Sequence, residues 1–164
     1  MEFYETTDGR LGMREIPPVV SELLQQVPHW VDPEIEGIEE RLFPSPATGA
    51  AEAELRADWQ AFVEPELHEY FQSTRQVVEA DLRGLTEEDG TFMVEFSVKH
   101  ADAWLNALNQ ARLALAARHA FEEEELAGRE PREVRDERDL ALLQIHFYGM
   151  IQHWLLEILD DIEG

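Results

Sequence analysis

The sequence predicts a mainly helical α+β fold, in which a helical bundle carries a small antiparallel N-terminal β-sheet. Apolar and aromatic residues recur at three- and four-residue steps along most of the chain, as in amphipathic helices. A hairpin turn signal and a short alternating segment lie outside those helical stretches. Because 164 residues that are 44% hydrophobic can fill one core, we expect a single domain over residues 1–164.

The predicted sheet begins with a β-hairpin over residues 1–16, because Asp8-Gly9 is a two-residue turn signal. Closing the turn at those two residues places Tyr4 opposite Met13. Residues 91–97 alternate apolar and polar positions, so we expect them to form a third strand of the same sheet. A hairpin alone is marginally stable in water, and a third strand with covering helices would stabilise it.

Helices are expected through most of residues 17–85. Pro17-Pro18 can open the first helix, and Pro28 is expected to end it. Asp32 is a suitable N-cap for a second short helix. Farther along, Pro65 interrupts the helical spacing, either as a kink or as the start of a new helix.

Two long helices are expected at residues 98–120 and 131–160, where apolar residues follow the helical period. The acidic stretch 122–128 between them is expected to be a loop. Gly149 lies inside the second helix, where glycine costs about 1 kcal/mol relative to alanine. We therefore expect another helix to approach closely at that position.

The composition is strongly acidic, with 36 Asp and Glu against 13 Lys and Arg and a formal charge of −23. Such a surface repels phosphate backbones and anionic lipid headgroups, since binding to either depends on cations. We therefore expect neither direct nucleic-acid binding nor membrane binding. The chain has no cysteine and no apolar run long enough to span a bilayer, which favours a cytoplasmic location.

No arrangement of residues amounts to a catalytic or cofactor signature, so no catalytic residue, cofactor or metal is assigned. The six histidines are poorly spaced for a metal site. His146 and His153 share a helix face, but seven residues separate them by roughly 10 Å along the axis. A pocket between them, beside Gly149, is a weaker alternative to close helix packing.

The candidate binding residues are Asn109, Arg112 and Arg118, which interrupt an otherwise apolar, alanine-rich helix. One interpretation is structural: Arg112 bridges to a carboxylate of a neighbouring helix, because buried charges are usually paired. The alternative is functional: the three side chains line an interhelical pocket for an anion or a peptide carboxylate. The structural interpretation is favoured.

The run WLNALNQARLALAAR over residues 104–118 resembles the signature helix of DUF2017, a bacterial family of unknown function. The N-terminal hairpin and the aromatic C-terminal helix are similar to those of the family, and residues 41–44 resemble its LFP loop. Departures are the acidic insertion after His119 and the absence of cysteine, which rules out any thiol-based redox sensing suggested for relatives.

The resemblance implies no established enzymatic activity. It implies a role in regulation or protein handling, because genes of the family often lie beside the Clp protease adaptor and sulfur-transfer genes. Some relatives also carry a transcription-regulator label. The leading hypothesis is therefore a non-enzymatic regulatory or protein-interaction module that binds another protein. The alternative is a small-ligand-binding or catalytic domain that uses the Asn/Arg pocket. The sequence also allows a homodimer, since a helical protein rich in aromatics can expose an apolar patch that closes a symmetric dimer.

Overall fold

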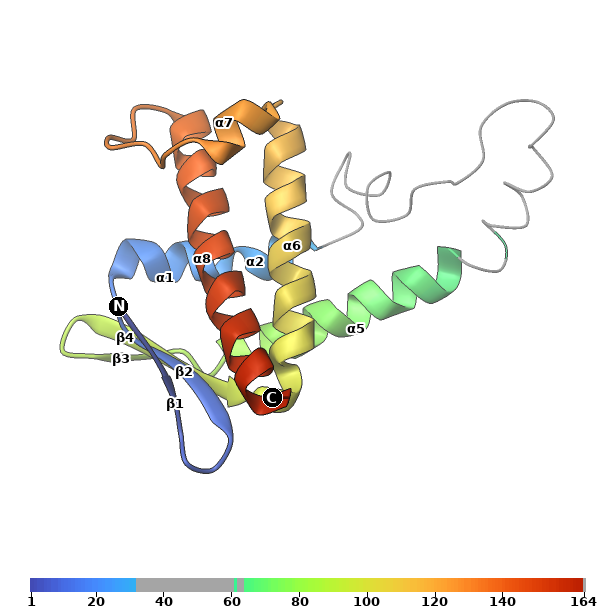
Figure 1. Cartoon of the computed structure of the whole chain (residues 1–164), viewed down its shortest axis with the longest axis vertical. Helices are drawn as coiled ribbons and strands as arrows, with labels where there is room; N and C mark the ends of the chain where they lie inside the picture. Colours follow the sequence, from blue (N-terminus) through green and yellow to red (C-terminus); the bar gives the residue numbers. More distant parts are fainter. Residues whose placement is uncertain (32–60, 62–63, 164) are drawn as a thin grey trace.

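The computed structural model describes residues 1–31, 61 and 64–163, and it confirms the predicted α+β class. A four-stranded antiparallel sheet packs against helices (Figure 1). Within these residues, no helix combines the length and the apolar character that crossing a bilayer would need.

Helices make up most of the described chain. In chain order they are α1 (Pro18–Gln25), α2 (Val27–Trp30), α5 (Glu64–Leu82), the 3-10 turn η3 (Val98–His100), α6 (Ala101–Arg118), α7 (Glu123–Ala127) and α8 (Glu137–Glu163). Helices α6 and α8 run antiparallel and side by side, and α1 and α2 lie across them (Figure 1). The sheet lies at the end where α6 begins and α8 finishes, and α7 lies at the opposite end.

The sheet has the strand order β1–β2–β4–β3. Its strands are β1 (Glu2–Glu5), β2 (Arg10–Ile16), β3 (Thr86–Glu88) and β4 (Thr91–Ser97). The predicted strand at 91–97 is confirmed as β4, and it pairs with β2. Strand β3 was not predicted. It pairs with β4 through a tight turn at Asp89 and Gly90, both of which have positive φ.

The predicted register of the N-terminal hairpin is wrong by one residue. Thr6 N–H donates to the Arg10 carbonyl at 2.8 Å, so the loop holds Thr7, Asp8 and Gly9 rather than two residues. Gly9 takes φ +81°, as three-residue hairpin loops require at their left-handed position.

The corrected register pairs Phe3, rather than Tyr4, with Met13. The Phe3 ring stacks on Trp154 of α8 with ring centroids 4.4 Å apart, which fixes β1 to the helices. Tyr4 lies on the other face of the sheet, where its hydroxyl donates to Glu95 at 2.7 Å. Partial burial, together with this carboxylate, raises the pKa of Tyr4 to about 12.

Pro18 and Pro28 each lie in the first turn of a helix. Helix α1 ends at Gln25, and Pro28 lies in the first turn of α2, so the prediction that Pro28 ends a helix is wrong. The missing N–H of proline costs nothing in a first turn, where that group has no helical partner. Pro65 lies in the first described turn of α5, and residues 62–63 just before this helix lie outside the described residues, so the choice between a kink and a new helix stays open. The helix predicted from Asp32 and the LFP loop lie outside the described residues.

The two long helices are present with shifted ends. The segment predicted at 98–120 contains η3 and α6, and the one predicted at 131–160 is α8, which begins later and runs on to Glu163.

The stretch predicted as a loop at 122–128 contains α7, so that prediction is wrong. A capping box between Glu122 and Glu125 satisfies the backbone N–H groups at the start of α7. Arg138 of α8 pairs with Glu125 at 2.7 Å and lies over the Phe121 ring at 4.2 Å. The hydrogen bond from Arg138 lowers the pKa of Glu125.

Trp104 joins three elements at the centre of the fold. It is 0% exposed, and its ring stacks on Phe96 of β4 with centroids 4.8 Å apart. Its Nε1 donates to Asp81 of α5 at 2.9 Å. The same carboxylate lies 2.9 Å from Nδ1 of His100, just before α6. One acidic side chain thus receives two donors and ties α5 to the start of α6.

A second buried polar contact fastens α8 to α1. Tyr148 is 0% exposed, and its hydroxyl donates to the Leu23 carbonyl. Gln144 donates to the Tyr148 hydroxyl at 3.2 Å and to the Gln26 side chain at 2.9 Å. Burial raises the pKa of Tyr148, so this hydroxyl stays protonated and keeps its donor role.

Removing the Asp81 carboxylate should destabilise the fold, because the buried indole N–H of Trp104 would lose its acceptor. We expect Asp81→Ala to lower the free energy of unfolding by about 1–3 kcal/mol, measured by urea denaturation. The double variant D81A/W104F should lose less than the sum of the two single changes. Asp160→Ala is the exposed control and should change stability by at most about 0.5 kcal/mol. Additive losses would show that the two side chains are not coupled.

Candidate functional site

The three predicted site residues lie on different sides of α6. Arg112 faces α8, where its Nη1 donates to Gln152 at 2.7 Å. Arg118 faces α2, with its guanidinium carbon 5.7 Å from the centre of the Trp30 ring. Asn109 is exposed. Because Arg112 and Arg118 turn toward different helices, the structure does not gather the three side chains around one space.

Arg112 is half-buried and bonded to a neutral partner. Throughout the described segments, no carboxylate forms an ion pair with it, and its Nε is buried with no hydrogen-bond partner. Gln152 in turn donates to the Leu105 carbonyl at 3.3 Å. The expected bridge between helices therefore exists, but an amide on α8 stands where a carboxylate was expected.

Gly149 lies against the Arg112 side chain. A Cβ added at Gly149 would lie 3.4 Å from the guanidinium carbon and 3.5 Å from Nε, which are ordinary van der Waals distances. Close approach was expected here, and the approaching group is an arginine side chain rather than the backbone of a second helix. The contact by itself does not require a glycine at position 149.

The two histidines of α8 do not converge on one site. His153 is exposed and lies 3.2 Å from Glu157 on its own helix. The Nε2 atom of His146 is buried and has no hydrogen-bond partner among the described residues. Over the same part of the chain, His, Asp and Glu side chains form no group of three or more that could hold a metal.

The last two turns of α8 carry a concentration of negative charge that the sequence did not single out as a site. We call these residues the α8 acidic end: Leu156, Glu157, Asp160, Asp161, Ile162 and Glu163. No basic residue lies in the last turn of the helix. The carboxylates of Asp160, Asp161 and Glu163 form no ion pair with any described residue. The helix dipole adds partial negative charge at the same place.

Apolar side chains emerge among these carboxylates. Ile151 and Leu155 are 0% exposed and belong to the core-facing stripe of α8. At the next steps of that stripe Ile158 is half-buried, and Ile162 is 54% exposed. Leu156, on a neighbouring face, is 50% exposed. The core-facing stripe thus continues beyond the part of the protein that covers it.

The helical spacing of apolar residues could have shown this feature. Ile151, Leu155, Ile158 and Ile162 follow one another at three- and four-residue steps. The predicted helix ends at residue 160, so the predicted apolar stripe does not include Ile162. The exposure of Ile162 depends on where the sheet and α6 end, and that is a tertiary property.

The contact between Gly149 and Arg112 can be tested with a double-mutant cycle. Gly149→Ala should raise the free energy of unfolding by about 1 kcal/mol, because helix propensity improves and the added Cβ meets Arg112 at an ordinary van der Waals distance. In an Arg112→Ala background the gain should be the same within about 0.5 kcal/mol. Thermal and urea denaturation of the four proteins would measure both effects. A Gly149→Ala gain that appears only in the Arg112→Ala background would show that the added methyl group crowds Arg112.

Comparison with known proteins gives a single result. The family model described as "Domain of unknown function (DUF2017)" matches residues 9–159. No curated protein and no solved structure matches the chain significantly. The matched range runs from the turn of the N-terminal hairpin to the last turns of α8, and so takes in almost the whole fold described above. The chain belongs to the DUF2017 family.

Proposed function

We propose that this chain is a cytoplasmic, non-enzymatic module that binds another protein through the α8 acidic end. The partner surface would be a basic, amphipathic segment, with apolar side chains that cover Ile162 and Leu156 and cations that face the carboxylates. The observation that carries the proposal is the core-facing stripe of α8, which becomes exposed at Ile162 beside Asp160, Asp161 and Glu163. These three carboxylates form no ion pair with the described residues, and the last turn of α8 has no basic residue.

Apolar burial supplies one part of the binding energy. Ile162 and Leu156 are each about half exposed. Covering the exposed half of one such side chain contributes on the order of 1 kcal/mol. Two side chains alone would give weak binding, so affinity and specificity also require the surrounding charges.

Electrostatics supplies the second part and selects the partner. Asp160, Asp161 and Glu163 repel one another and the negative end of the helix dipole. A basic partner relieves that repulsion, whereas an acidic or phosphate-bearing partner increases it. The chain-wide charge of −23 acts in the same direction over longer distances. The resemblance to a family encoded near a protease adaptor agrees with a protein as the partner.

The proposal predicts binding that depends on this one surface. Affinity capture from lysate of the native host, read by mass spectrometry, would compare the wild type with the triple variant Asp160→Asn, Asp161→Asn, Glu163→Gln. A matched control neutralises three exposed acids of the β3–β4 turn: Glu87→Gln, Glu88→Gln, Asp89→Asn. We expect one basic partner to be retained by the wild type and the control and lost by the α8 variant. Cross-links should map to α8.

Binding should also weaken with salt. Raising NaCl from about 0.05 M to about 0.3 M shortens the Debye length from roughly 14 Å to roughly 6 Å. The captured partner should therefore decline as salt rises, and a purified pair would show the decline as a higher Kd. Equal capture by all three proteins, or capture that salt does not change, would reject this surface. Capture of nothing but further copies of the same chain would replace the proposal with a homodimer.

A further inference from the structure

The two longest stretches of the sequence without an acidic residue lie on the two long helices. No Asp or Glu occurs at residues 103–121, which include most of α6, or at residues 140–156, which form the middle of α8. Elsewhere acids are frequent, since the chain has 36 of them in 164 residues. Because α6 and α8 pack side by side, the two stretches form one part of the molecule (Figure 1).

One side of this helix pair is covered, and the other carries exposed side chains. Tyr148 of α8 and Arg118 of α6 contact α1 and α2, which cross the pair on the covered side (Figure 1). Leu113 lies two residues after the buried Ala111, which turns it about 200° away from the core. Met150 has the same relation to the buried Tyr148. Leu113 is 46% exposed and Met150 is 45% exposed.

The exposed side chains of these stretches are apolar or neutral. They recur at three- and four-residue steps, and each is exposed or half-buried. The flanking acids on these helices are Asp102, Asp139 and Glu157, and Glu157 lies 3.2 Å from a histidine at the edge of the surface. We call this surface the α6–α8 outer face: Asn109, Leu113, Ala117, His146, Met150 and His153.

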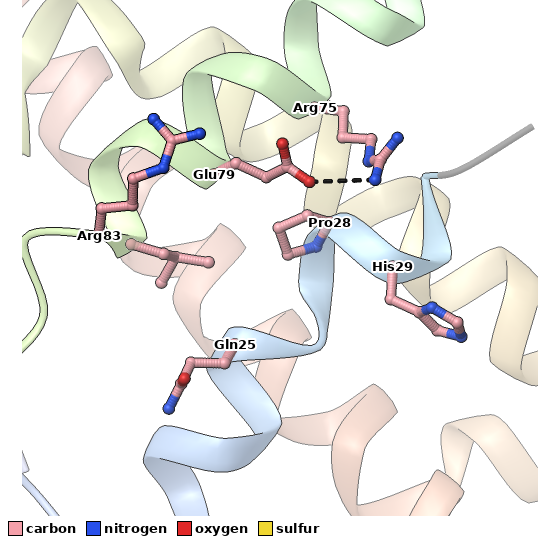
Figure 2. A pocket seen from close by; sticks show the side chains of 7 residues that line it. Gln25, Pro28, His29, Arg75, Glu79 and Arg83 are labelled. Carbon is pink, nitrogen blue, oxygen red and sulfur yellow. Dashed lines mark ion pairs between the residues drawn. The ribbon is translucent and has the colours of Figure 1, made fainter.

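Surfaces elsewhere on the described chain are charged. Figure 2 shows Arg75, Glu79 and Arg83 along the groove between α5 and the α1–α2 segment. Carboxylates also crowd the α8 acidic end. Since each copy of the chain has a charge of −23, two copies repel each other most where their carboxylates meet. The α6–α8 outer face is a surface on which two copies can approach without bringing carboxylates together.

We propose that the α6–α8 outer face binds the same face of a second copy, so that two α6–α8 pairs pack together in a symmetric dimer. Two-fold symmetry brings one patch against itself, which a patch without like charges permits. A basic partner would find no carboxylate here, and an acidic partner would be repelled by the chain as a whole. This inference does not rest on the proposed function.

The size of the outer face agrees with a weak dimer. The helix rise and the spacing of packed helices make it about 25 Å long and about 20 Å wide. Its flat area is on the order of 500 Å², and side chains make the accessible area larger than that. A standard interface buries about 800 Å² per partner, so this face lies near the lower end of stable interfaces. We therefore expect a dimer Kd in the micromolar range.

The test is sedimentation equilibrium of the full chain at increasing protein concentration, because the dimer fraction follows mass action. Raising NaCl from about 0.05 M to about 0.5 M screens the repulsion between copies and should lower the dimer Kd at least about threefold. The basic partner proposed for the α8 acidic end should bind more weakly under the same change. The two proposals therefore fail independently.

The variants Leu113→Glu and Met150→Glu place like charges against each other across the interface, and each should raise the dimer Kd at least about tenfold. Val19→Glu is the matched control, because Val19 is 62% exposed on α1 and lies outside the outer face. It should leave the Kd unchanged. Both outer-face variants change exposed side chains, so their Tm should stay near that of the wild type. Met150→Glu decides the test if Leu113→Glu lowers the Tm.

Three results would overturn the proposal. A monomer at every protein and salt concentration would leave the outer face to a different protein. A dimer that Met150→Glu does not weaken would place the interface elsewhere. A dimer that Val19→Glu weakens as much as Met150→Glu does would show that added charge alone, and not its position, controls association.

Discussion

The contact of Trp104 with Phe96 and Asp81 holds the fold together, because three different elements meet at this one indole. Its ring packs on the sheet, its N–H is bound by α5, and its backbone belongs to α6. With α6 fixed in this way, α8 can lie along it, and Arg112 of α6 donates to Gln152 of α8 beside Gly149.

The surface at the end of α8 combines two features that one kind of ligand would satisfy. Carboxylates gather there around exposed apolar side chains, and a basic, amphipathic protein segment would complement both. The chain-wide charge of −23 would attract such a partner and repel an acidic one.

Regular periodicity allowed the fold class, β4 and both long helices to be predicted, because burial on one face leaves a repeating signal in the sequence. Short local motifs were harder to predict from the sequence. The loop of the first hairpin contains Thr7 as well as Asp8-Gly9, and that one extra residue changes every pairing in β1. The capping box of α7 was not predicted, because Glu122 and Glu125 lie in a run of glutamates that indicated a loop. The candidate site was only partly predictable: the spacing marked Arg112 as facing another helix, but it could not show that Arg118 turns to α2 or that Arg83 borders a cavity. Those facts depend on how separate elements meet.

The central pairing of the sheet sets the order in which the chain can fold. Strand β2 lies near the beginning of the sequence, and its partner β4 lies beyond α5. The paired residues Leu11 and Phe96 are therefore separated in sequence by more than half of the chain. By contrast, α5, β3, β4 and α6 are consecutive, and the Asp81–Trp104 contact closes within that stretch. Contacts near in sequence form faster than distant ones, since less chain entropy is lost. The middle of the chain can therefore assemble first and serve as the template on which the N-terminal hairpin docks as its last strand pair.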